Sequence, residues 1–202
     1  MLKLPQVTLV CIDCVNHRSA LNAMLKSMES IQFADALFIS NLAPERTEQG
    51  ITLHTIPKLE SKEAYSFFVL NNLNDYIETP FCLVVQYDGY VINPHLWTDD
   101  FLNYDYIGAP WWYDHLNVGN GGFSLRSKIL LAACQLENFE RFHPEDDVIC
   151  RGERPYLEKK YNVKFAPEIL AERFSFEPNG LHPEFKNLNF GFHGVPNLIL
   201  CT

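Results

Sequence analysis

Along the first 85 residues, continuous apolar runs take turns with segments whose apolar positions have helical spacing. This pattern predicts strands separated by helices. Four continuous apolar runs are typical of buried strands, at residues 7–15, 36–40, 51–56 and 81–85. Residues 19–30 and 61–76 repeat their apolar positions about every 3.6 residues, which predicts two amphipathic helices. Strands that alternate with helices form mostly parallel sheets with right-handed crossovers. We therefore expect a single α/β, Rossmann-like domain over residues 1–202, with a mostly parallel central sheet flanked by helices.

The second half of the chain has a different texture. Residues 93–112 are dense in Pro, Trp, Tyr and Asp, which indicates an irregular loop with a short strand at residues 104–107. Two further helices are predicted from suitable N-cap residues, at 125–134 after Ser124 and from Asp146 or Asp147 toward Lys160. The part from residue 174 onward is expected to be rich in loops.

Charge and composition exclude several classes of protein. The 25 acidic side chains outnumber the 16 basic ones and give a formal charge of −9, so duplex nucleic acid is not an expected partner. No apolar run approaches the roughly 20 residues of a membrane helix, and the first residues lack the pattern of a signal peptide. The spacing of the six cysteines does not match a disulfide framework. Cys11 and Cys14 form one Cys-x-x-Cys pair, but a zinc site would need a second pair, so buried, reduced thiols are expected. We expect a soluble, cytoplasmic protein without a transmembrane segment.

Asp88 follows the apolar run at residues 81–85 almost directly. Ligands of open α/β sheets bind at the carboxyl ends of strands, so this carboxylate is a candidate ligand for a hard cation such as Mn²⁺ or Mg²⁺. His193, between Phe192 and Gly194, is a candidate second metal ligand. A solvated Asp-Gly turn and a loop histidine that only packs are the alternative interpretations.

A glycine-rich run at residues 119–122 predicts a loop whose backbone amides can approach a sugar or a phosphate. Its spacing and position differ from those of a dinucleotide-binding loop, which would follow the first strand. Arg126, expected just inside the next helix, either contacts a phosphate or pairs with an acid. A glycine-rich turn without a ligand is the alternative.

Three consecutive acids, Glu145, Asp146 and Asp147, follow Pro144. The positive end of a helix dipole favours carboxylates at such a place, which explains them without any function. One carboxylate could instead take the proton from an attacking hydroxyl group as general base, and Asp146 is our choice. Adjacent acids also raise one another's pKa.

Two adjacent tryptophans, Trp111 and Trp112, follow a Gly-Ala-Pro run. They are either a plug for the core or a platform on which an acceptor sugar stacks. Asp105 lies between two tyrosines nearby and is a candidate contact for an acceptor hydroxyl group.

Five short runs together resemble a bacterial and viral domain family of unknown function that is regarded as glycosyltransferase-like. They lie at residues 86–89, 104–111, 118–126, 145–146 and 190–194. The order of these runs also resembles that of nucleotide-sugar glycosyltransferases of the GT-A type and, more distantly, that of the β-1,4-galactosyltransferases. The resemblance covers about residues 50 to 195.

The resemblance implies a GT-A fold and assigns roles to particular residues. Asp88 and His193 would bind the metal, and Asp146 would be the catalytic base with Glu145 as its acidic neighbour. Gln86 stands where those enzymes have the first Asp of an Asp-x-Asp motif, which puts one ribose or metal contact in question. The donor would be bound from the end of the first strand, the end of the central strand and the glycine loop, that is by Asn16, His17, Arg18, Gln86, Asp88, Gly121, Gly122 and Arg126.

These residues predict a metal-dependent, inverting glycosyltransferase that moves a sugar from a uridine nucleotide sugar to a glycan acceptor. A glycosyltransferase that acts on a modified nucleobase or on a protein is one alternative. A non-catalytic domain that binds nucleotide sugars is the other, and Gln86 is its best support.

Overall fold

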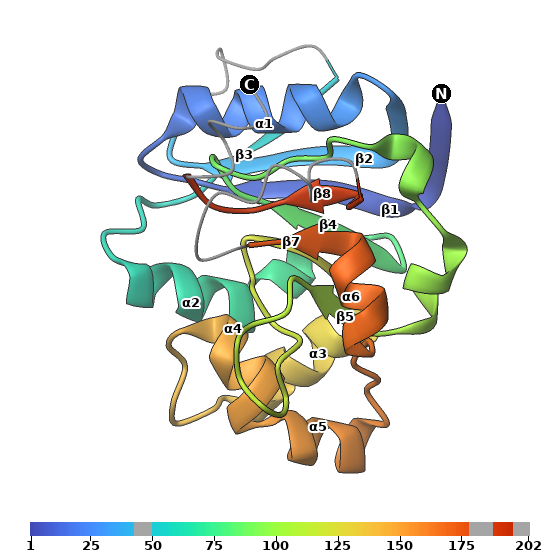
Figure 1. The fold of residues 1–202 in the computed structure, drawn as a ribbon. Helices are drawn as coiled ribbons and strands as arrows, with labels where there is room; N and C mark the ends of the chain where they lie inside the picture. Colours follow the sequence, from blue (N-terminus) through green and yellow to red (C-terminus); the bar gives the residue numbers. More distant parts are fainter. Residues whose placement is uncertain (43–49, 178–187, 196–202) are drawn as a thin grey trace.

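The computed structural model describes residues 1–42, 50–177 and 188–195 and contains a central sheet of six strands in that part of the chain (Figure 1). The strands are β1 (Leu2–Ile12), β2 (Ile31–Ser40), β3 (Thr52–Thr55), β4 (Phe81–Val85), β5 (Tyr106–Gly108) and β6 (Phe123–Ser127). Their order is β3-β2-β1-β4-β6-β5, and β1 to β4 run parallel. Only β6, which pairs with β4 and β5, is antiparallel within this sheet. The predicted α/β fold with a mostly parallel sheet is confirmed.

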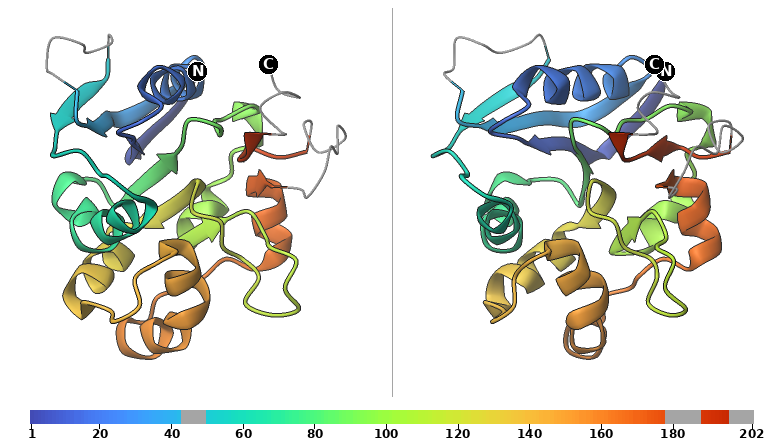
Figure 2. Two further views of the ribbon diagram at one scale, coloured as in Figure 1. Left: turned by 90° about the vertical axis from the view of Figure 1, so that its left-hand side faces the viewer. Right: turned by 60° about the vertical axis from the view of Figure 1, so that its left-hand side comes forward.

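Helices cover both faces of the sheet (Figures 1 and 2). They are α1 (His17–Met28), α2 (Lys62–Asn71), α3 (Lys128–Glu137), α4 (Glu145–Asp147), α5 (Arg154–Tyr161) and α6 (Glu168–Phe174). Neighbouring residues of a strand face opposite sides, so Leu9 belongs to one core cluster with Met24 of α1 while Val10 belongs to another with Val69 of α2. None of the helices within the described residues is long and apolar enough to cross a bilayer.

The cysteines that the structure describes are free thiols buried in these cores, as expected from the sequence. They are Cys11, Cys14, Cys82, Cys134 and Cys150. Cys201 lies outside the described residues.

The segment at residues 123–127 differs most from the predicted elements, because it is the buried strand β6 and not the start of a helix. Helix α3 begins only at Lys128, since Ser127 and not Ser124 is its N-cap and accepts a hydrogen bond from Leu130 N at 3.0 Å. Pairing with strands on both sides keeps the segment extended. The prediction of a helix over 125–134 was therefore wrong in its first turn.

The helix predicted from residue 146 to residue 160 is interrupted. A single π-type turn, Val148–Gly152, follows α4, and α5 begins at Arg154 with Pro155 in its first turn. Proline has no amide proton and cannot continue a preceding helix, which explains the new start.

The C-terminal part contains two short parallel strands, β7 (Ser175–Phe176) and β8 (Gly191–Phe192). The residues around β8 also bond to the chain that follows β4, with Ile92 N donating to Phe190 O at 3.0 Å and Gly194 N donating to Asp88 O at 3.1 Å. These bonds bring His193 to the carboxyl end of β4.

Candidate active site

Three polar side chains converge beyond the end of β4. His193 Nε2 lies 3.3 Å from Asp88 Oδ1 and 3.2 Å from Gln86 Oε1. Gln86 presents this oxygen because its Nε2 donates to Tyr65 OH at 3.1 Å. Asp88 is 6% exposed, and its Oδ1 is buried without a well-aligned hydrogen bond. The residues predicted at this strand end therefore share one small polar centre with His193.

Glu177 holds the other side of the His193 ring. Its Oε1 lies 3.0 Å from His193 Nδ1, and its Oε2 accepts a hydrogen bond from Asn120 Nδ2. Burial alone lowers the pKa of His193, but the hydrogen bonds and charges of Asp88 and Glu177 outweigh it and raise this pKa to about 9. The resulting contribution to stability is complete below the ordinary histidine pKa of about 6.5 and is lost as the pH rises through about 9.

The glycine loop packs between His193 and the acidic run. Gly121 N donates to Asp146 Oδ2 at 2.9 Å, and Gly122 N donates to Asn120 Oδ1 at 3.2 Å. These two amides are thus used inside the protein, and the expected amide cradle for a ligand is not formed by them. Glycine is required because a Cβ on Gly122 would overlap the His193 imidazole, and one on Gly121 would lie 2.5 Å from Glu145 Oε1.

Gly122→Ala is expected to displace the His193 ring from Asp88. The pKa of His193, followed by NMR of the ring protons, should then fall from about 9 toward its ordinary value of about 6.5. Gly152→Ala is the matched control, since its Cβ would meet no atom closer than 3.7 Å. An unchanged titration of His193 in the Gly122 variant would contradict this close packing.

Arg126 and Glu145 form a buried ion pair beneath the glycine loop. Arg126 is 0% exposed, and its Nη2 lies 3.1 Å from Glu145 Oε1 and 3.4 Å from Gly121 O. Burial raises the pKa of Glu145, the charge of Asp146 raises it further, and Arg126 opposes both without reversing the direction. The side chain of Arg126 is enclosed in the sheet and pairs with an acid, so the expected phosphate contact is not supported by its position.

Asp146 is fixed by two backbone amides. Its Oδ2 accepts from Gly121 N and its Oδ1 accepts from Asp147 N, both at 2.9 Å. Asp147 points elsewhere, toward Arg141 and toward Arg151 Nε at 3.4 Å. Of the three adjacent acids, Asp146 is therefore the one held against the glycine loop.

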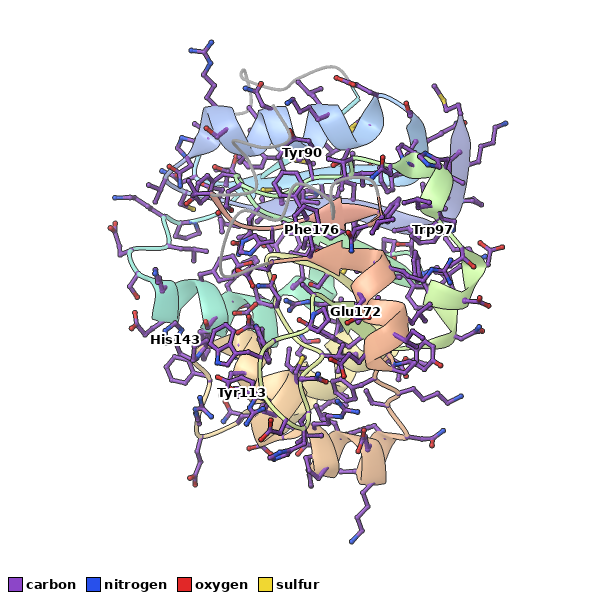
Figure 3. The ribbon with its side chains drawn as sticks, in the orientation of Figure 1. Tyr90, Trp97, Tyr113, His143, Glu172 and Phe176 are labelled. Atoms are coloured by element: carbon purple, nitrogen blue, oxygen red, sulfur yellow. The ribbon has the colours of Figure 1, made fainter. Side chains whose placement is uncertain are left out.

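Two pockets lie beside residues that contact His193. One has a volume of about 670 Å³ at the carboxyl end of β1, and Asn16, Gln86 and Asp146 are among its lining residues. The other has about 710 Å³, and Trp112 and Glu177 are among the residues that line it. His193 contacts Gln86 on one side and Glu177 on the other, so it stands between the two pockets. Figure 3 labels His143, which lines the first pocket, and Glu172 and Phe176, which line the second.

A protein-family profile matches residues 50–193, well over half of the chain. The chain belongs to this family, described as "Protein of unknown function (DUF5672)". No curated protein sequence matches the chain.

Two solved glycosyltransferases share the fold of this DUF5672 chain. A glycosyltransferase involved in the glycosylation of the major capsid of PBCV-1 aligns with a TM-score of 0.52 and 13% identity, over 93% of this chain and 91% of that one. The apo-form glycosyltransferase GlyE of Streptococcus pneumoniae TIGR4 aligns with a TM-score of 0.50 and 12% identity. That alignment covers 92% of this chain and 53% of GlyE, so the DUF5672 chain spans about half of GlyE.

Some predicted donor residues of the DUF5672 chain lie away from the centre. His17 Nε2 bonds to Asn41 Oδ1 at 2.9 Å, and Arg18 is exposed on α1. Neither lines the 670 Å³ pocket, whereas Asn16 does.

Among the predicted acceptor residues of the DUF5672 chain, Asp105 lies at the opposite end of the sheet, before β5. Its Oδ1 accepts from Ser127 Oγ at 2.6 Å and its Oδ2 from Lys164 N at 2.8 Å, so it ties β5 to its neighbours and its position does not support an acceptor role. Trp111 packs against Gly119 and plugs the core in part. Trp112 is 70% exposed beside the 710 Å³ pocket.

Sequence reasoning on the DUF5672 chain missed Glu177, Tyr65 and His143. Tyr65 and His143 line the 670 Å³ pocket, and Ser66 Oγ lies 2.8 Å from His143 Nδ1. No local motif marks these residues, because each reaches the site through a contact between segments far apart in the sequence.

Proposed function

We propose that this chain is an inverting glycosyltransferase that moves a sugar from a uridine diphosphate donor to a glycan acceptor with the help of a divalent cation. The observation that carries the proposal is the centre formed by Asp88, His193 and Asp146 with the glycine loop, which stands between two pockets. A transfer reaction needs two substrates that meet at one reacting atom. The fold shared with two glycosyltransferases supports the same interpretation.

The 670 Å³ pocket is the proposed donor site. It opens at the carboxyl ends of β1 and β4, where ligands of α/β sheets bind, and its volume suits a nucleotide-sized ligand. Asn16 and Gln86 line it at these two strand ends. A sugar attached to the diphosphate would then reach Asp146, which lines the same pocket.

The residues at the centre fit a hard divalent cation. His193 Nε2 lies 3.3 Å from Asp88 Oδ1 and 3.2 Å from Gln86 Oε1, which is about the separation of ligands that share one cation, roughly 3 Å. The other ring nitrogen of His193, Nδ1, lies within hydrogen-bonding distance of Glu177 Oε1. A carboxylate in this place is typical of metal-bound histidines. The described residues hold no cluster of three His, Cys, Asp or Glu side chains with metal-site geometry, so the third protein ligand here is the amide oxygen of Gln86. A bound cation would neutralise the leaving diphosphate as a Lewis acid.

The chemical step assigned to the protein itself is a proton transfer. Asp146 accepts the proton of the acceptor hydroxyl group as that oxygen attacks the sugar carbon from the face opposite the diphosphate. Gly121 N and Asp147 N hold the carboxylate in place. The buried pair of Arg126 and Glu145 supports the loop from below.

Asp88→Asn is expected to remove the metal dependence of nucleotide binding. The loss of Mn²⁺-dependent affinity should be at least the roughly 10–100-fold seen when a group that only orients a metal ligand is removed. Calorimetric titration with UDP, with and without Mn²⁺, measures it, and a thermal melt checks the fold. Asp100→Asn, at an exposed position, is the control. Unchanged metal dependence would remove Asp88 from the site.

A screen of nucleotide sugars tests the overall proposal. UDP release should be measured with Mn²⁺ or Mg²⁺ and with glycan, protein and nucleobase acceptors in separate reactions. Tight nucleotide binding without release for any acceptor would favour the non-catalytic alternative, which the amide at Gln86 supports. Release with a protein or a nucleobase only would replace the glycan acceptor.

A further inference from the structure

The 710 Å³ pocket contains two buried polar atoms that no group of the described residues satisfies. Ser175 is 0% exposed and Asn189 is 4% exposed, and both residues line the pocket. Ser175 Oγ and Asn189 Oδ1 have no hydrogen-bond partner within the described chain. Asn189 Nδ2 donates to Glu172 O, which leaves the amide oxygen unused. A buried polar atom without a partner is costly, so these two atoms indicate a polar ligand.

Carboxylates dominate the charged groups of the same pocket. Glu168 and Glu172 are four residues apart on α6, where Figure 3 labels Glu172, and neither carboxylate has an ion pair or hydrogen bond with another described residue. Among the described residues that line the pocket, Arg173 is the one cationic side chain. Carboxylate and amide oxygens accept hydrogen bonds, so the pocket requires a ligand that mainly donates them.

An aromatic platform completes the pocket. Trp112 is 70% exposed and lies 5.6 Å from the Tyr113 ring, centre to centre. Arg151 stacks on Tyr113 at 3.7 Å and donates to His115 O at 3.0 Å, which fixes this loop. An exposed, supported indole ring suits the apolar face of a sugar ring.

We propose that this pocket binds the acceptor through uncharged or amino-bearing sugar units and excludes acidic sugars. Hydroxyl and ammonium groups donate to Glu168, Glu172 and Asn189, whereas a uronic acid offers a carboxylate that these acids repel. The assignment rests on the proposed function, because it makes the pocket the acceptor side of that reaction. It adds the chemical class of the acceptor.

Saturation-transfer NMR with three disaccharides tests the proposal, with and without UDP and Mn²⁺. Cellobiose and the glucosamine disaccharide chitobiose are expected to bind, and digalacturonic acid is not. Glu172→Lys should weaken chitobiose and allow digalacturonic acid to bind. Glu140→Lys makes the same charge change at an exposed position outside the pocket and should alter neither.

Ser175→Ala separates a ligand contact from a structural role. Ser175 Oγ makes no hydrogen bond in the protein, so its removal should leave the melting temperature unchanged or higher. Binding of cellobiose should nevertheless weaken by roughly tenfold, the scale of one lost hydrogen bond. Loss of stability without loss of binding would overturn the assignment.

UDP affinity measured on the same samples distinguishes a failure of the proposed acceptor class from a failure of the proposed glycosyltransferase function. If UDP binds and no disaccharide does, or if digalacturonic acid binds best, the acceptor class is wrong and the glycosyltransferase proposal stands. If neither UDP nor any sugar binds, both fail.

Discussion

Asp146→Asn is expected to lower the rate of sugar transfer by roughly a hundredfold or more, the scale of a lost general base, while UDP binding is retained. Asparagine keeps the shape of the side chain and one oxygen that can accept from Gly121 N, so the glycine loop should stay in place. It cannot accept the proton of the acceptor hydroxyl group.

Transfer rate and UDP affinity should be measured on one preparation of the Asp146 variant. Asp147→Asn is the matched control, because Asp147 pairs with Arg141 and Arg151 and not with the loop. Equal losses of binding and transfer in the Asp146 variant would instead identify Asp146 as a structural support of the loop.

Arg126→Met is expected to destabilise the protein by about 3–5 kcal/mol, because it leaves a buried carboxylate without its partner. Glu145 is 5% exposed, and Arg126 is its ion-pair partner among the described residues. Such a loss is a large share of the stability of an ordinary domain. The denaturation midpoint in urea, with its slope, gives the change.

The double variant Arg126→Met with Glu145→Gln separates the charge from the packing. Removing both charges should recover much of the lost stability, since a neutral amide costs less to bury than an unpaired carboxylate. If the double variant is as unstable as the single one, the arginine stabilises the sheet by its packing and its bonds to Ser124 and Gly121.

The sequence predicts best those features that depend on neighbours along the chain. The apolar run of β4 and the helix that Ser61 caps were both predicted, because strand and helix periodicity and an N-cap hydrogen bond are local. The position of Asp88 at a strand end follows from the same pattern. Its closeness to His193 could be expected only from the resemblance to known enzymes.

Features that depend on contacts between distant segments were not predictable in this way. From the sequence, an arginine such as Arg126 is expected at the surface. Nothing near it in the sequence indicates that Glu145 lies beneath the glycine loop and forms an ion pair with it. Glu177 likewise contacts the His193 ring only because β7 pairs with β8, which places the two residues side by side. A charge can be buried there because its partner comes from another segment, and that information is not local.

The pairing of β7 with β8 also orders events during synthesis of the chain. All six strands of the main sheet lie within residues 2–127, so a nascent chain can fold this sheet while Glu177 and His193 are still to be made. Gln86, Asp88 and the other residues that line the 670 Å³ pocket or the proposed cation centre are then made before Glu177 and His193. If the proposed function holds, a chain stalled on the ribosome before residue 193 would carry the main sheet without the imidazole of the cation centre, and metal-dependent nucleotide binding would first appear when β8 docks beside β7.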